Sequence, residues 1–345
     1  MNLTSDNNSG VCPEVLAAIS VEAERFDAAY GMDEASARLE ESMAEVFERP
    51  VAVYPVPTGT AANSLALAAT NPVWGTVLCH ELAHIAVDEC SAPTVIGSGL
   101  TVTPLPGHHG KLEPATIEHH IEHRRDSGVH TAAVSGLSIT QATEAGTRYS
   151  PAEVGALCDT AHAHGLKVHL DGARFANAVA AAGASPSELT WRAGVDIMSF
   201  GATKGGALGA EAVVVFSDEL RDDIERLRKR TGHLLSKQRF ASAQFNAWLH
   251  DGAWLSHADH ANQCASRLAH GLTGAGVEIV YPVEANIVFA LIDHETDVAA
   301  REAGAGYYIE SSPPGDDRKE ARLVTSWSTT ADEVDRFVAA VARPL

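Results

Sequence analysis

The sequence is poor in basic residues and in long apolar runs, and each shortage excludes a class of protein. Among its 345 residues, 25 are Lys or Arg and 45 are Asp or Glu, so the formal net charge is −20 with His neutral. Nucleic-acid backbones and anionic membrane surfaces both attract clustered basic residues. No apolar stretch reaches the ~18 residues that a membrane-spanning helix needs. We therefore expect neither a nucleic acid nor a membrane as a partner.

Cysteine is also scarce. The five cysteines are scattered, and none belongs to a Cys-x-x-Cys pair: Cys12, Cys79, Cys90, Cys158 and Cys264. An odd and dispersed set predicts reduced thiols rather than a disulfide framework. The first residues, MNLTSDNNSG, lack the basic start and apolar run of a secretory signal. With 45% hydrophobic and 20% charged residues, the chain is predicted to be a globular cytoplasmic protein, with an enzyme as the favoured class.

Short β-rich runs alternate with helical patterns through most of the chain. Strands are predicted at 51–56, 76–80, 100–105, 131–140, 166–170, 196–200 and 211–217. Helices are predicted at 59–70, 114–126, 151–164 and 218–230. This alternation is typical of a mostly parallel sheet with helices on both faces.

The pattern changes after about residue 240. Further helices are predicted at 239–250, 256–275 and 331–342, with two short strands on either side of Pro282. We therefore expect a large α/β domain over 1–245 and a small α+β domain over 246–345.

Two motifs follow predicted strands, at the edge where open α/β sheets bind ligands. Thr58-Gly59-Thr60 opens helix 59–70, and free N–H groups at a helix start suit a phosphate. An ordinary N-cap turn would have the same sequence. Asp171 ends the apolar strand 166–170, where a buried carboxylate needs a cation. A helix cap or an ion pair with Arg174 is the alternative there.

Two further motifs carry a lysine and a pair of histidines. Lys204 lies where an apolar strand enters a Gly-rich turn, and burial would lower its pKa toward that of a nucleophilic amine. An exposed loop lysine is the alternative. His80-Glu81-Leu82-Ala83-His84 has the spelling of a zinc motif. A zinc protease needs that motif inside a long helix, whereas here β-rich IAVDEC is predicted to follow, so no metal is expected.

Taken together and in order, the motifs resemble the L-threonine aldolase family from about residue 3 to the C-terminus. The resemblance is carried by SDNNSG near the start, YGMDE at 30–34, TGTAAN at 58–63, AHIAVDEC at 83–90, TEAGTRY at 143–149, HLDGARF at 169–175, SFGATKGGALGAE at 199–211 and RLVTSW at 322–327. That family consists of pyridoxal 5'-phosphate (PLP) enzymes with the aminotransferase-like fold (fold type I), grouped with the β-eliminating lyases. The resemblance thus implies PLP as cofactor and an α/β large domain with a small C-terminal domain.

The resemblance also implies roles for particular residues. Lys204 would bind PLP as a Schiff base, and Asp171 would pair with the pyridinium nitrogen. His84 would stack over the ring and act as the base near the substrate β-hydroxyl. Gly59 and Thr60 would hold the phosphate at the helix start.

On the substrate side, Arg174 and Arg322 would clamp the α-carboxylate, because a guanidinium matches a carboxylate bidentately. Arg174 also counts among the expected cofactor contacts. Ser5 and Tyr30 would line the pocket. Some family members carry a His in an E-N-T-H-N string where this chain has SITQA at 138–142. Gln141 cannot act as an acid or base there, but it could hydrogen-bond a substrate hydroxyl.

The expected activity is retro-aldol cleavage of L-threonine, L-allo-threonine or a related β-hydroxy-α-amino acid to glycine and an aldehyde. Three alternatives stay open: a β-eliminating lyase on the same fold, a non-catalytic scaffold, and a zinc hydrolase at His80 and His84. The resemblance further implies a homo-oligomer, a dimer or tetramer. The basic residues Lys229, Lys237 and Arg239 would then reach a neighbouring subunit's cofactor, with a solvated helix face as the alternative.

Overall fold

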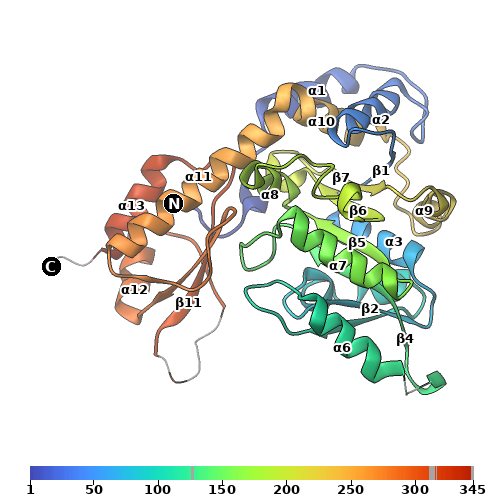
Figure 1. Cartoon of the computed structure of the whole chain (residues 1–345). Helices are drawn as coiled ribbons and strands as arrows, with labels where there is room; N and C mark the ends of the chain where they lie inside the picture. The colour runs from blue at the N-terminus through green and yellow to red at the C-terminus, as the bar shows by residue number, and fades with distance from the viewer. Residues whose placement is uncertain (126–127, 311–314, 316, 343–345) are drawn as a thin grey trace.

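The computed structural model describes residues 1–125, 128–310, 315 and 317–342. Two separate sheets organise this part of the chain, each with its own hydrophobic cluster. The larger sheet and its helices occupy one side of the molecule, and the long helix α11 (Ala253–Gly274) leads to the smaller sheet (Figure 1). None of the described helices combines the length and the apolar character needed to cross a membrane.

The large sheet has seven strands in the order β1-β7-β6-β5-β4-β2-β3. Their bounds are β1 Ala52–Val56, β2 Gly75–His80, β3 Thr101–Leu105, β4 Ala133–Thr140, β5 Lys167–Gly172, β6 Ile197–Gly201 and β7 Glu211–Val215. β7 is antiparallel to both of its neighbours, and the other pairs are parallel. The predicted α/β fold with a mostly parallel sheet is therefore confirmed.

Helices cover both faces of this sheet, which explains why its central strands are continuous apolar runs. α7 and α6 lie on one face and α3 lies on the other (Figure 1). The helices of this part are α1 Pro13–Ala23, α2 Glu34–Val46, α3 Gly59–Thr70, α4 His84–Val87, α5 Ala92–Ile96, α6 Pro114–Arg125, α7 Pro151–Ala163, α8 Phe175–Ala182, α9 Arg221–Arg230 and α10 Arg239–Leu249. Ser150 and Glu153 form a capping box at the start of α7.

One prediction was wrong. The string IAVDEC at 85–90 was expected to be β-rich, but its first three residues belong to the short helix α4 (His84–Val87). Its backbone turns there because the N–H of Asp88 donates to the carbonyl of His84 at 2.9 Å. Helices α1, α2 and α8 had not been predicted.

The small sheet is antiparallel, with the order β10-β11-β9-β8. Its strands are β8 Glu278–Ile279, β9 Ile287–Ile292, β10 Tyr308–Ile309 and β11 Lys319–Val324, and α11, α12 (His294–Glu302) and α13 (Ala331–Val341) accompany them. Leu3 is fully buried in this cluster, and its backbone bonds to Gly306 and Val324 at 2.8 Å each. The N-terminal residues thus pack on the small sheet, although the sequence grouped them with the large domain.

The division between the two parts stays a prediction. The boundary expected after residue 245 falls inside α10, and α11 then leads away from the large sheet.

The topology of the large sheet fixes where a ligand can bind. β1, β4, β5 and β6 end at one edge of the large sheet, and the antiparallel β7 begins at that same edge.

Candidate active site

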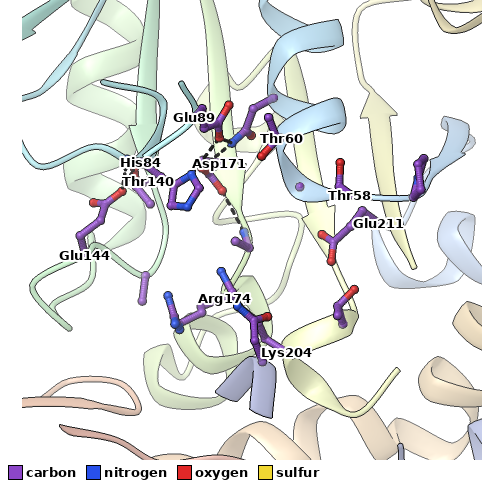
Figure 2. Close-up of a pocket in the computed structure, with 17 residues that line it drawn as sticks. Thr58, Thr60, His84, Glu89, Thr140, Glu144, Asp171, Arg174, Lys204 and Glu211 are labelled. Atoms are coloured by element: carbon purple, nitrogen blue, oxygen red, sulfur yellow. Dashed lines mark hydrogen bonds and ion pairs between the residues drawn. The ribbon is translucent and has the colours of Figure 1, made fainter. Parts of the chain in front are cut away.

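A cavity of about 270 Å³ opens at this edge of the large sheet. Figure 2 shows its lining, which comes from the ends of β1, β4, β5 and β6, from the start of β7, and from α3 and α4. All the residues expected to bind the cofactor line this cavity: Gly59, Thr60, His84, Asp171, Arg174 and Lys204. Of the residues expected to bind substrate, only Arg174 does so.

Lys204 lies in a short 3-10 turn, Thr203–Gly205, directly after β6. Burial lowers the pKa of Lys204, and the positive charge of Arg174 adds to this effect. The carboxylates of Asp6 and Asp171 oppose the shift without cancelling it. The outcome is an amine that loses its proton more readily than an exposed lysine, as a nucleophilic amine requires.

Asp171 is buried near the end of β5 and faces the cavity. Its Oδ2 accepts a hydrogen bond from Asn63 Nδ2 at 2.8 Å, and its Oδ1 accepts one from the N–H of Ala173 at 3.0 Å. The two hydrogen bonds fix the orientation of the carboxylate. The alternative of an Asp171–Arg174 ion pair is not what the structure shows, because Arg174 bonds Asp6 instead.

His84 is the first residue of α4 and belongs to a hydrogen-bond chain whose other members are buried. Its Nδ1 lies 2.9 Å from Glu89 Oε1, and Asn63 Nδ2 donates to that same oxygen at 2.7 Å. Asn63 therefore bridges Glu89 to Asp171 (Figure 2). The hydrogen bond that His84 donates to Glu89 is the main cause of the raised pKa of His84, while burial raises the pKa of Glu89 itself. The sequence interpretation had assigned no role to Asn63 or Glu89, although both lie in quoted strings.

Glu144 is a second acidic group beside His84. Its Oε1 accepts hydrogen bonds from the His84 N–H at 2.8 Å and from Thr140 Oγ1 at 3.2 Å. Its Oε2 is buried without a partner. Burial raises the pKa of Glu144 to about 7. The string TEAGTRY was the only signal that could have marked this residue.

Gln141 does not line the cavity. Its side chain is fully buried, with Nε2 donating to the carbonyl of Tyr149 at 2.8 Å and Oε1 accepting from the Tyr149 N–H at 2.9 Å. Both ends of the amide thus bond the backbone of a neighbouring loop. Both amide ends are occupied by Tyr149, so the expected contact between Gln141 and a substrate hydroxyl stays a prediction without support from this placement.

Arg174 is held by Asp6, a residue for which the sequence interpretation had predicted no role. Nε and Nη2 of Arg174 donate to the two oxygens of Asp6 at 2.8 and 2.9 Å, and Asn286 Nδ2 donates to the same carboxylate at 3.0 Å. Burial by itself would raise the pKa of Asp6, but Arg174 and Lys204 outweigh it, so the pKa is lowered. A buried and fixed guanidinium therefore faces the cavity beside Lys204.

The other expected substrate contacts lie outside the cavity lining. Arg322 lies on β11, and burial together with the charge of Arg174 lowers its pKa. Ser5 caps the turn Asp6–Asn8, where its Oγ accepts from the Asn7 N–H at 3.2 Å. Tyr30 is half exposed, with its ring centroid 4.9 Å from Lys229 Nζ.

His80 and His84 lack the helical setting of a zinc protease motif. His80 ends β2, where its Nδ1 accepts the N–H of Leu82 at 3.1 Å, whereas α4, which begins at His84, has only four residues. The long helix of a zinc protease is absent from this stretch of described residues.

The comparisons with known proteins agree with the geometry. A family profile described as "Beta-eliminating lyase" matches residues 2–295. A low specificity L-threonine aldolase of a Pseudomonas species is 40% identical over 336 residues, which cover 97% of this chain and 95% of that protein. The chain belongs to the L-threonine aldolase family. Within this family, a Leishmania major threonine aldolase structure aligns with a TM-score of 0.93 at 28% identity, covering 99% of this chain and 98% of that one.

More distant structures support the fold class alone. An aspartate aminotransferase from Thermus thermophilus aligns with a TM-score of 0.70 at 16% identity, covering 99% of this chain and 95% of that one. The aminotransferase-like fold expected of a threonine aldolase family member is thereby confirmed.

PLP is the cofactor of this family, and the residues present fit it. Lys204 supplies the amine and the fixed carboxylate of Asp171 supplies a partner for a protonated ring nitrogen. Gly59 begins α3 next to Thr58, whose side chain accepts the N–H of Ala61, and the remaining N–H groups of this helix start would bind a phosphate. The residues that would hold the ring and the phosphate thus share one cavity.

Proposed function

We propose that this protein cleaves L-threonine, L-allo-threonine or a related β-hydroxy-α-amino acid to glycine and an aldehyde. The observation that carries the proposal is the convergence of Lys204, Asp171 and His84 on one cavity beside a fixed arginine, Arg174. The Pseudomonas and Leishmania relatives carry the name threonine aldolase. Their similarity extends over nearly the whole chain, which supports the same reaction here.

The cofactor, when bound, supplies the electron-accepting ring that takes up the electron pair released as the Cα–Cβ bond breaks. Asp171 would keep the ring nitrogen protonated, because a fixed carboxylate favours the cationic form. Lys204 would hold the cofactor through its amine and be displaced by the amino group of the substrate. Arg174 would bind the α-carboxylate, which orients the Cα–Cβ bond.

His84 would accept the proton of the β-hydroxyl. Its Nδ1–H can donate to Glu89, which leaves Nε2 as the acceptor of the proton. Glu144 bonds the backbone N–H of His84 and so fixes the start of α4. The base is therefore held from two sides, by Glu89 and by Glu144.

Three substrates assayed side by side test this function: L-threonine, L-allo-threonine and phenylserine. We expect glycine together with acetaldehyde or benzaldehyde as products. Ammonia and a keto acid would instead indicate a β-eliminating lyase. We also expect a visible absorbance band from PLP bound to Lys204, lost in Lys204→Ala. A colourless wild-type protein that does not take up PLP would favour the non-catalytic scaffold.

We further propose a cytoplasmic homo-oligomer, a dimer or tetramer. Phe26, Met32 and Leu208 are strongly exposed apolar side chains, with 106%, 77% and 64% of their reference surface accessible. Leu208 belongs to the loop that follows Lys204, so a partner covering it would approach the site. Light scattering on the purified chain distinguishes monomer, dimer and tetramer.

A further inference from the structure

Glu211 is an acidic residue in the cavity to which neither the family resemblance nor the proposed reaction assigns a role. It is the first residue of β7, in register with Val56 of β1 on one side and Gly201 of β6 on the other. β1 leads into Thr58-Gly59-Thr60, and β6 leads into the turn that carries Lys204. Glu211 therefore stands between the phosphate-binding turn and the lysine.

Close packing fixes its carboxyl group at that place. A Cβ atom added to Gly59 would lie 3.8 Å from Glu211 Oε2, and one added to Gly201 would lie 2.8 Å from it. The absence of a side chain at Gly201 thus makes room for the carboxyl group, whereas a Cβ at Gly59 would meet it at an ordinary van der Waals distance. The residue is 7% exposed and lines the cavity, and Figure 2 shows it next to Thr58. A phosphate held at the start of α3 would lie within reach of this group.

The charge of Glu211 decides whether a contact between its carboxyl group and a phosphate is favourable. Burial raises the pKa of Glu211 to about 7, with Asp171 on β5 adding to the shift. Hydrogen bonding to Thr203 and the charge of Lys204 act in the opposite direction. An ionised carboxylate would repel a phosphate dianion at this distance, whereas a protonated carboxyl group can donate its O–H to a phosphate oxygen. The phosphate itself favours the protonated form, because like charges raise a carboxyl pKa.

We propose that Glu211 is a cofactor-binding residue that donates a hydrogen bond, as a neutral carboxylic acid, to the phosphate of PLP. The proposal rests on PLP binding and is independent of which amino acid the protein cleaves. It couples cofactor affinity to pH: binding above the carboxyl pKa of the free protein requires uptake of a proton, so affinity falls as pH rises.

The test compares the wild-type full-length chain with Glu211→Gln, whose amide donates an N–H at every pH. The probe is pyridoxamine 5'-phosphate, because it cannot bond covalently to Lys204, and pyridoxamine is the control that lacks the phosphate. We expect the wild-type Kd for the phosphorylated probe to rise by up to about tenfold per pH unit between about pH 7 and about pH 8.5, relative to the variant. Pyridoxamine should show parallel pH profiles in the two proteins.

Parallel profiles for the phosphorylated probe would overturn the proposal. A wild-type-to-variant difference that persists with pyridoxamine would overturn it too, because Glu211 would then act on the ring or on Lys204. Phosphorus NMR of the wild-type holoenzyme gives a reading that does not depend on the variant folding. The resonance of bound PLP should shift at the pH where the rise of the wild-type Kd levels off, because the carboxyl group of the bound state loses its proton there. A Kd that levels off without a shift of the resonance would contradict the proposal.

Discussion

Asp6 and Arg174, 168 positions apart in sequence, form a two-point ion pair at the edge of the cavity. The pair is almost completely buried, with 1% and 10% of the two side chains exposed. A buried ion pair does little for stability by itself, but removing one partner leaves an uncompensated charge. The clear consequence of the Asp6–Arg174 pair is the orientation of Arg174, because its guanidinium is fixed before a substrate carboxylate binds.

Asp6→Asn should therefore weaken substrate binding more than it slows the chemical step. The amide keeps the size of the side chain but loses the charge and one acceptor oxygen, so Arg174 is no longer held at both nitrogens. We expect KM for the amino acid to rise about tenfold or more, with a smaller change in kcat. Steady-state kinetics measure this split, and the absorbance of bound PLP serves as the control for an intact cofactor site. An unchanged KM would mean that Asp6 does not orient Arg174.

Glu89→Gln should change the pH dependence of the reaction. Glu89 raises the pKa of His84, so the variant should have a His84 of lower pKa. A base must be unprotonated, and activity is lost below its pKa. The acidic limb of the kcat/KM profile should consequently move to lower pH in the variant. In His84→Asn that limb should disappear, with a loss of about 10²–10⁴ in rate. A limb that stays in place in Glu89→Gln would show that another group titrates there.

Glu144→Gln should alter the choice between threonine diastereomers. The unpartnered Oε2 of Glu144 is the free acceptor beside His84, where the β-hydroxyl would lie. One hydrogen bond is worth about 1 kcal/mol, so the ratio of kcat/KM for L-threonine and L-allo-threonine should change about fivefold. Thr140→Val is the matched control, since it removes a bond to Oε1 and leaves Oε2 unchanged. An equal effect in both variants would indicate a structural role for Glu144.

His169 should make stability depend on pH. Its ring lies 2.9 Å from both Ser138 Oγ and Ser199 Oγ, and burial lowers its pKa to about 4. As pH falls, His169 binds a proton near about pH 6.5 in the unfolded chain. In the folded chain it does so only near about pH 4. The contribution of neutral His169 to the free energy of unfolding is therefore fully present above about pH 6.5 and is lost as pH falls toward about 4. From the size of the shift we expect a loss of about 3 kcal/mol.

Urea unfolding of the wild type and of His169→Asn, at about pH 7 and about pH 4.5, measures this contribution. The wild type should lose more unfolding free energy than the variant over this interval. Equal losses would assign the acid sensitivity to other groups.

Much of the large sheet could be predicted because its elements carry local signals. Helix 59–70 and helix 331–342 agree with α3 and α13 to within a residue, since a capping threonine marks the start of each. α2 also carries such a signal, with Asp33 as the N-cap and Leu39 and Met43 buried, but it had not been predicted. The short helix α4 has no side-chain cap and only four residues, so no local pattern distinguishes it from a strand.

The acidic members of the site were much harder to predict than Lys204 or Asp171. Asp6, Glu89, Glu144 and Glu211 are four of 45 acidic residues, and no local pattern shows which of them are buried. Their burial results from contacts between distant segments, such as Asp6 with Arg174. Gln141 illustrates the converse, because its sequence neighbours Thr140 and Ala142 line the cavity while its own side chain bonds the backbone of Tyr149.

The anchoring of Leu3 has a mechanical consequence for catalysis. Leu3 is embedded in the core of the small sheet, and Asp6, only three positions later, holds Arg174 on the large one. Three residues of extended chain span about 10 Å at most. Leu3 and Asp6 can therefore move apart only slightly. A movement of the small sheet relative to the large one would therefore displace Arg174. Binding of the amino acid would then depend on how the two parts of the chain are positioned.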